Sequence, residues 1–416
     1  MSGLLITALL FPLAGCVTSR RPLAECFLLG VGVVGASLFI LGLFHVPFVV
    51  TIALVIVAGL LGYWVARSPS NRATQQPSNR FALIAIVIPL AVLAISAAVV
   101  PLNDFDGRGF WLLKAKALVH ERVIDGPFFH NQVVDDPRNQ YPLLIPLDAA
   151  TVMLAGGETD DRQVRWLYLF TFAALVFVVA RRINPWCGAI LAWLPQFAVN
   201  NEGGALTAYN DIVVAAFVTC AFLDLMEGQS PFRFGLWLAF LVLTKNEGLP
   251  IALIFLVIGM ASFRRRIGWS IAPVAVAIAA LIAWRSGIPR TDEENFVTLL
   301  PSLASHVDRV VPAVIEYGKH FFIVSKWGLL WVAAWIALAV LAWRKEWRAP
   351  VVVLSISAVY IGAYVVTQWM MRELIDASAD RLLMHMIGPA LFAIASATDA
   401  SARNRYSQPE YQPKSV

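Results

Sequence analysis

The sequence predicts an all-α polytopic membrane protein, and three observations support this fold class. Hydrophobic residues make up 59% of the 416 residues and charged residues only 14%, whereas a soluble globular protein has about 25% charged residues. The apolar residues form long continuous blocks, which suit transmembrane helices and differ from the short alternating segments of a β-barrel. The basic residues lie in short clusters between the blocks, which is typical of cytoplasmic loops. The net charge of +5 is therefore a topology signal, and we expect no nucleic-acid partner.

The apolar blocks predict 12 or 13 transmembrane helices. A helix that crosses the hydrocarbon core needs about 20 apolar residues. The block at 234–263 is interrupted by the sequence KNEG at 245–248, so we expect two short helices there. The predicted spans are 4–18, 23–43, 46–66, 81–101, 165–180, 185–199, 207–226, 234–263, 268–285, 326–343, 350–367 and 382–398.

The order of blocks and basic clusters predicts three parts. Residues 1–80 form N-terminal transmembrane helices and a polar cytoplasmic linker, 81–398 form the membrane domain with the candidate site, and 399–416 form a disordered cytoplasmic tail. If every basic cluster is cytoplasmic, residues 102–164 form an extracytoplasmic loop. Its segment 110–122 is expected to be a helix that lies on the membrane surface.

Residues 102–146 form a polar stretch in this apolar sequence. Asp104 and Asp106 follow the span 81–101 directly, and Asp106 begins a glycine-rich sequence, DGRG, that predicts a turn. A carboxylate at the membrane surface can accept a proton from a sugar hydroxyl as that hydroxyl attacks. The alternative is a solvated loop whose charges pair with one another. Trp111 lies in the same stretch and is a candidate for stacking on a sugar.

Charges at two further positions interrupt or begin apolar helices. Lys245 and Glu247 either pair with each other or form a re-entrant turn at the floor of a site, because isolated charges in a membrane are costly. Asp211 lies in the first turn of the span 207–226, beside Tyr209. It either stabilises the helix N-terminus or binds a sugar hydroxyl or a metal.

Arg381 is expected to open the last span on the outer side of the membrane. An arginine there can bind a phosphate group through two hydrogen bonds, or it can extend to the lipid headgroups. The same two alternatives apply to Arg372. The histidines and cysteines show no zinc-ligand spacing, so we expect no zinc site. No cofactor is assigned, and a divalent cation bound by the carboxylates stays open.

Five short motifs follow one another between residues 81 and about 389 and together resemble a known family. The most specific is TKNEG at 244–248, and the block around Asp106 is moderately specific. The motifs are Asp106 with Trp111, Lys114, Ala115 and Lys116; Tyr141-Pro142-Leu143-Leu144; Tyr209 with Asp211; Thr244–Gly248; and Asp380-Arg381-Leu382-Leu383. Their order resembles that in the GT-C superfamily of polyprenyl-phosphate-sugar-dependent glycosyltransferases. The nearest resemblance is to bacterial members similar to protein O-mannosyltransferases and lipid A aminoarabinose transferases.

The resemblance implies a GT-C-like fold and sugar transfer with inversion of the anomeric configuration. Asp106 is the implied general base, with Asp104 as the near alternative. The donor phosphate is neutralised by basic residues, and Glu247 orients Lys245 or binds the acceptor. The implied phosphate-binding residues are Lys245, Arg381 and Arg372, and the implied substrate-binding residues are Trp111, Lys114, Tyr141, Tyr209, Asp211 and Glu247.

This sequence also departs from the family pattern. Members often have His-Pro-Asp before the Tyr-Pro-Leu motif, whereas this chain has Pro137-Arg138-Asn139-Gln140. Asp135 and Asp136 are therefore the candidates for the second acidic position. Three predicted spans precede the span 81–101 that leads into the loop with Asp106, whereas the family pattern has one span before this loop.

The resemblance implies a multi-pass protein of the bacterial cytoplasmic (inner) membrane whose active site faces the periplasm. Its partners are a polyprenyl-phosphate-sugar donor, a glycan, lipid or protein acceptor, and membrane lipid. One alternative is a transporter or flippase for a lipid-linked or small solute that uses Lys245 and Glu247 as a coupling site. Another is a non-catalytic scaffold, which would tolerate neutral residues at these positions.

Overall fold

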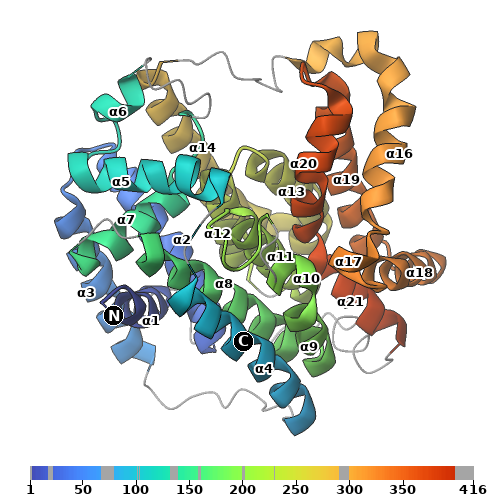
Figure 1. Ribbon diagram of the computed structural model, residues 1–416, viewed down its shortest axis with the longest axis horizontal. Helices are drawn as coiled ribbons and strands as arrows, with labels where there is room; N and C mark the ends of the chain where they lie inside the picture. The colour runs from blue at the N-terminus through green and yellow to red at the C-terminus, as the bar shows by residue number, and fades with distance from the viewer. Residues whose placement is uncertain are drawn as a thin grey trace.

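The computed structural model describes residues 2–16, 22–66, 79–100, 102, 104–131, 139–157, 161–198, 202–228, 230–289 and 299–398. Within these ranges the chain forms helices joined by turns, and no strand occurs (Figure 1). The all-α prediction is therefore confirmed for the described residues. The expected tail 399–416, most of the linker before residue 80, and Asp135 and Asp136 lie outside them.

Five helical segments are long and apolar enough to cross a membrane. They are α2 (Leu23–Gly42), α4 (Arg80–Val99), α8 (Asp161–Arg182), the continuous run Gly248–Gly287, and α19 (Arg348–Val366). A sixth is added if α20 (Met371–Met384) and α21 (Ile387–Thr398) together form one bent span.

Several of the other predicted spans form shorter helices. They include α1 (Ser2–Gly15), α12 (Pro231–Thr244) and α18 (Leu330–Trp343), and a helix of 14 residues is only about 21 Å long. Helix α7 (Leu144–Gly156) lies outside the predicted spans. The predicted span 185–199 breaks into α9 (Pro185–Trp193) and α10 (Pro195–Ala198), because proline removes a helical hydrogen bond. The remaining elements are α3 (Phe48–Ala66), η1 (Gly107–Trp111), α5 (Leu112–Glu121), α6 (Pro127–His130), α11 (Asp211–Glu227), α13 (Gly248–Phe263), η2 (Arg264–Ile267), α14 (Gly268–Gly287), η3 (Leu300–Arg309), α16 (Val310–His320) and α17 (Val324–Trp327).

The charged interruption at 245–247 divides the apolar block 234–263 as predicted. Helix α12 ends at Thr244, and α13 begins at Gly248. A Cβ atom on Gly248 would lie 1.8 Å from the carbonyl oxygen of Leu241, so only glycine permits this close return of the chain. The turn therefore holds Lys245 and Glu247 at the junction of the buried helix α12 and the partly exposed helix α13.

The predicted start of the last span, at residue 382, is wrong. Helix α20 already begins at Met371, and the chain bends by 54° between α20 and α21. Pro389 explains the bend, because proline cannot donate a backbone hydrogen bond to residue 385 and its ring clashes with that carbonyl group. Arg381 consequently lies in the last turn of α20, one turn before the bend, and does not open a span.

The glycine-rich sequence after Asp106 also differs from the prediction. Residues 107–111 form a π-helical turn, η1, that continues into α5. The expected turn is therefore wrong, whereas the helix expected at 110–122 is confirmed with slightly different ends.

Figure 1 shows α6 and the last turns of α14 at the same end of the molecule as the start of α16.

Helix α11 lies at the centre of the molecule (Figure 1). Every residue from Asp211 to Leu225 is buried. The helix packs against α8, α12, α13, α20 and α21, because it is apolar on all sides and has no face suited to water. Its two ends carry the buried acidic residues Asp211 and Asp224. Each of these aspartates forms ion pairs with basic residues of other segments.

Candidate active site

The structure brings Asp106 and Arg381 together although 275 positions separate them in the sequence. The NH1 atom of Arg381 lies 3.1 Å from Oδ2 of Asp106, and both side chains are 17% exposed. The guanidinium group of Arg381 also lies over the ring of Tyr209, 4.9 Å from its centre. This cation–π contact favours a fixed guanidinium orientation. The first candidate base and one candidate phosphate ligand are thus direct neighbours.

Asp211 forms a second, deeper group with Lys245. The Nζ atom of Lys245 lies 2.9 Å from Oδ1 of Asp211 and 3.4 Å from Oε1 of Glu247. Asp211 and Lys245 are buried, whereas the Glu247 side chain is 27% exposed. A buried lysine of this kind needs an anionic partner to remain charged. The charged turn between α12 and α13 therefore points its ammonium group at the start of α11.

Two residues that the sequence did not identify complete this group. The Nε2 atom of His385 lies 3.2 Å from Oδ1 of Asp211, and its Nδ1 atom lies 2.5 Å from the hydroxyl group of Tyr360. In a neutral imidazole, Nε2–H donates to the carboxylate and Nδ1 accepts from the tyrosine. His385 follows Arg381 by one helical turn, and this spacing is the signal that places both on one face. Sequence reasoning considered the histidines only as zinc ligands.

Several buried polar atoms of this cluster make no hydrogen bond within the part of the chain that the structure describes. They are Oδ2 of Asp211, Oε2 of Glu247 and Nε of Arg381. Buried polar groups in folded proteins are nearly always hydrogen-bonded, so each exception requires an explanation. The cluster thus retains both acceptors and a donor for the polar groups of a ligand.

Two glycines allow the supporting segments to approach each other. A Cβ atom on Gly107 would lie 2.2 Å from the carbonyl oxygen of Thr207. Gly203 has a φ of +85°, and a Cβ atom there would lie 3.1 Å from Cγ of Arg381 and 3.4 Å from Cβ of Asp211. The segment 202–210 therefore fills the space between η1 and α20. It fixes how Asp106 and Arg381 face each other.

Asp104 is half-buried and makes no ion pair with Arg381 among the contacts of the described residues. Burial raises the pKa of its carboxyl group above the ordinary value, and a repulsive Glu202 adds to this effect. A raised pKa makes a carboxylate a stronger base near neutral pH. Asp104 therefore remains the alternative base, two residues from Asp106.

Trp111, Lys114 and Tyr141 form an aromatic cluster beside the candidate site. The ring centre of Trp111 lies 5.8 Å from that of Tyr141, and Nζ of Lys114 lies 4.3 Å from the ring centre of Phe110. Trp111 is 4% exposed and Lys114 is fully buried. In this structure both side chains contact protein, so Trp111 offers no open face on which a sugar could stack.

Arg372 is not brought to this cluster. Its side chain is 70% exposed and lies 2.7 Å from Glu316, and nine residues, about 13 Å of helix, separate it from Arg381. Hydrogen bonds from Lys319 and Arg372 lower the pKa of the Glu316 carboxyl group. The contact of Arg372 is an ordinary surface ion pair.

No group of three or more His, Cys, Asp or Glu side chains is arranged to hold a metal ion among the described residues. Comparison of the chain with protein-family models, with curated proteins and with solved structures finds no match. Function is therefore inferred from the chemistry of the cluster and not from the fold.

Proposed function

We propose that the protein is an inverting glycosyltransferase that moves a sugar from a polyprenyl-phosphate-linked donor to an extracytoplasmic glycolipid, glycan or protein. Asp106 acts as the general base. The observation that carries the proposal is the contact of 3.1 Å between Asp106 and Arg381, next to the buried Lys245. A base and two cations that suit a phosphate are what this reaction requires.

In the proposed reaction, the acceptor hydroxyl transfers its proton to the Asp106 carboxylate while its oxygen attacks the anomeric carbon. The bond between that carbon and the phosphate oxygen breaks on the opposite face, which inverts the configuration. The electron pair leaves with the polyprenyl phosphate, where Arg381 and Lys245 neutralise the developing negative charge. Positioned charges of this kind lower the barrier because they need no rearrangement during the reaction.

The ion pair between Asp106 and Arg381 gives donor binding a role in activation. A donor phosphate that binds Arg381 competes with Asp106 for the guanidinium group. The Asp106 carboxylate can then turn to the acceptor hydroxyl and accept its hydrogen bond. A GT-C-like arrangement of 12 or 13 spans, with this cluster facing the periplasm of the bacterial inner membrane, belongs to the same proposal.

The second candidate function is transport of a lipid-linked or small solute. One observation favours it: Lys245, Asp211 and His385 form a buried, ionisable chain in the centre of a helical protein, and such groups mark transport pathways in membrane proteins. Transport would leave the chemical structure of the solute unchanged, whereas sugar transfer produces a new glycoside.

The test is mass spectrometry of glycolipids and cell-envelope glycans from cells with the wild-type gene, without it, or with Asp106→Asn. We expect one glycan to lose a sugar without the gene. The asparagine variant should lower transfer by about 10²- to 10⁴-fold, the usual range for loss of a general base, at unchanged abundance in the membrane. Asp308→Asn is the matched control, because Asp308 is exposed in η3.

Asp104→Asn decides between the two candidate bases. If Asp106 is the base, this variant keeps most of the activity and the acidic side of its pH–rate profile does not move. If Asp104 is the base, activity disappears in this variant. The wild-type enzyme then loses activity on acidification at a higher pH than an ordinary carboxyl would give, because the pKa of Asp104 is raised by burial. Full activity in both variants would refute the glycosyltransferase proposal.

A further inference from the structure

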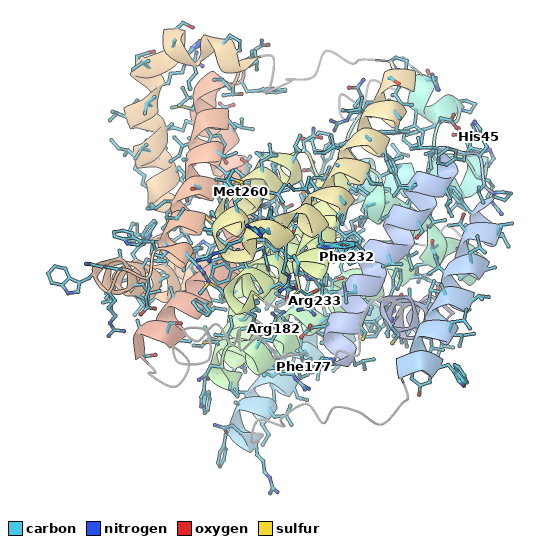
Figure 2. All side chains as sticks on the ribbon, turned by 180° about the vertical axis from the view of Figure 1, so that it is seen from behind. His45, Phe177, Arg182, Phe232, Arg233 and Met260 are labelled. Atoms are coloured by element: carbon cyan, nitrogen blue, oxygen red, sulfur yellow. The ribbon has the colours of Figure 1, made fainter. Side chains whose placement is uncertain are left out.

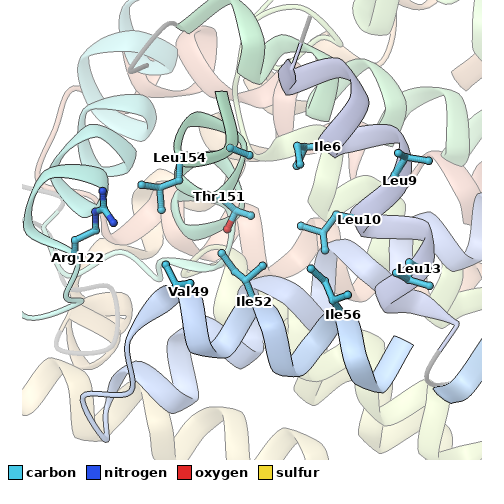
Figure 3. Close-up of a pocket in the computed structure, with 11 residues that line it drawn as sticks. Ile6, Leu9, Leu10, Leu13, Val49, Ile52, Ile56, Arg122, Thr151 and Leu154 are labelled. Atoms are coloured by element: carbon cyan, nitrogen blue, oxygen red, sulfur yellow. The ribbon is translucent and has the colours of Figure 1, made fainter. Parts of the chain in front are cut away.

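A cavity of about 390 Å³ lies between α1, α3 and α7, apart from the candidate active site. Most of the residues that line it are aliphatic, and Thr151 and Arg122 are the polar exceptions (Figure 3). Its volume falls within the range of about 300–1,000 Å³ that is common for small-molecule sites. The nearly uniform apolar wall suits a hydrocarbon and offers few groups for a polar ligand.

The cavity opens sideways onto an apolar surface. Leu9 and Val49 line it and are nevertheless 68% and 65% exposed. Other large apolar side chains of α3, such as Leu54 and Leu61, are exposed as well, at 54% and 60%. An apolar surface of this extent is stable in lipid and costly in water. Lipid chains are therefore the molecules that can enter the cavity from its open side.

Arg122 lies at one end of the cavity, opposite Leu13 (Figure 3). It follows the last residue of α5 with a φ of +62°, a left-handed conformation that is unfavourable for a residue with a side chain and usually selects glycine. Its Nε atom donates to the carbonyl oxygen of Val119 at 2.9 Å. Among the described residues, no carboxylate pairs with this guanidinium group. A strained position thus holds an exposed arginine at the end of the apolar cavity.

We propose that the cavity binds an anionic phospholipid, with one acyl chain in the cavity and the phosphate at Arg122. Along α1 the lining extends from Ile6 to Leu13, about 10 Å of helix. One leaflet contributes about 15 Å of hydrocarbon, half of the usual core thickness. The cavity therefore holds most of one acyl chain while the guanidinium group stands at the level of the headgroup.

A polyprenyl-phosphate donor does not fit both sites at once. Arg122 lies sixteen residues after Asp106 in a run that is helical from residue 105 to 121, a separation of about 24 Å. A lipid whose phosphate binds Arg122 therefore keeps that phosphate far from Asp106. The occupant we infer is a membrane phospholipid, and the inference does not depend on the proposed glycosyl transfer.

The test is native mass spectrometry of the full-length protein released from nanodiscs that contain equal amounts of phosphatidylglycerol and phosphatidylcholine. The wild type should retain phosphatidylglycerol preferentially. Arg122→Gln should lose this preference several-fold. Arg264→Gln, at an exposed arginine in η2, should keep it. An unchanged preference in Arg122→Gln, or an equal loss in Arg264→Gln, would overturn the proposal.

A second variant tests the cavity itself. Ala155 lines the cavity and is exposed, so Ala155→Trp fills the space without removing a buried contact. It should lower the retention of both lipids, and its melting temperature should match that of the wild type. Unchanged lipid retention in this variant would refute the acyl-chain site. Displacement of the phospholipid by added farnesyl phosphate would also refute it, because the occupant would then be a polyprenyl phosphate.

Discussion

The two ends of α11 hold buried aspartates in contrasting surroundings. Asp224, near the last turn, accepts four hydrogen bonds: from Arg182 at 2.8 Å, from two atoms of Arg233 at 2.6 and 2.7 Å, and from Trp237 at 3.0 Å. Figure 2 labels Arg182 and Arg233, which lie close together. Asp211, in the first turn, accepts bonds from its partners on Oδ1 alone, and its Oδ2 has no partner among the described residues. About 20 Å of helix separates the two carboxylates.

The contrast is between the two carboxylates: that of Asp224 is structural, whereas that of Asp211 belongs to a candidate reaction site. Both oxygens of Asp224 are fully used by protein groups that also come from α8 and α12, so this end of α11 fastens three helices together. The Asp211 end has unused hydrogen-bonding capacity beside Lys245, Glu247 and Arg381. Buried polar groups that the protein itself does not satisfy are the ones that a ligand can satisfy.

The largest effect on folding should come from the Asp224 end of α11, where both carboxylate oxygens accept hydrogen bonds. Asp224→Ala leaves Arg182 and Arg233 buried without their shared anion, and removing one partner of a buried ion pair costs about 3–5 kcal/mol. We expect the variant to be scarce in the membrane and to melt well below the wild type in detergent. Asp106→Asn is the control in the cluster at the Asp211 end of α11, and this variant should melt like the wild type. Equal melting temperatures for Asp224→Ala and the wild type would remove the distinction between the two ends.

Lys245→Ala should affect both folding and chemistry, because it also leaves the buried Asp211 carboxylate without its ammonium partner. Loss of one positioned group that stabilises charge in the transition state commonly lowers kcat by about 10²- to 10³-fold. The KM for the lipid donor should rise more than the KM for the acceptor, because Lys245 is assigned to the phosphate. Lys319→Ala, at an exposed lysine, should leave both constants unchanged. An equal rise in both KM values for Lys245→Ala would indicate a general folding defect and not the loss of a phosphate ligand.

Tyr360→Phe should have a smaller effect, through the position of His385. The hydroxyl group bonds to Nδ1 of His385 at 2.5 Å, and a buried hydrogen bond contributes about 0.5–1.5 kcal/mol. We expect transfer to fall by about three- to tenfold, since tenfold corresponds to about 1.4 kcal/mol, with little change in melting temperature.

Tyr364→Phe is the matched control for Tyr360→Phe. Tyr364 lies one turn further along α19, is also buried, and bonds to Ser378 at 2.8 Å. It should alter transfer less, since Ser378 has no contact with Asp211 among the interactions of the described residues. If the two phenylalanine variants behave alike, Tyr360 has only a packing role.

Arg372→Gln should have the smallest effect. Its ion pair with Glu316 is exposed, and exposed pairs contribute little to stability because solvent screens them. Transfer kinetics in membranes should match the wild type within about twofold, as should the melting temperature. A strong loss of donor binding would show that Arg372 binds the donor phosphate, and it would imply that α20 moves during the reaction.

Local features of the site could be predicted from the sequence. The charges within an apolar block marked the break at Lys245, and the pattern of apolar residues placed Asp211 in the first turn of its helix, where α11 does begin. Both signals are short-range, because a helix start or break depends on residues within one or two turns.

Long-range and packing-dependent features could not be predicted from local patterns. The pairing of Asp106 with Arg381 requires the folded arrangement of η1 and α20, and the sequence suggested it only through a family resemblance. Hydrophobicity, on which the predicted span 382–398 rests, does not reveal the bend before Pro389. Local patterns also do not predict the helical conformation of residues 107–109, because glycine usually indicates a turn, whereas Gly107 here begins a π-helical turn packed against Thr207.

That contact also determines how rigidly the site is held. Because residue 107 presents only hydrogen atoms to the carbonyl group of Thr207, two main chains touch directly, and no side-chain rotamer can lengthen or shorten the gap. Main chains in close contact resist compression. The distance between the main chains of η1 and segment 202–210 should accordingly vary little with temperature or lipid composition. Any widening between Asp106 and Arg381 must therefore come from their side chains or from a shift of α20.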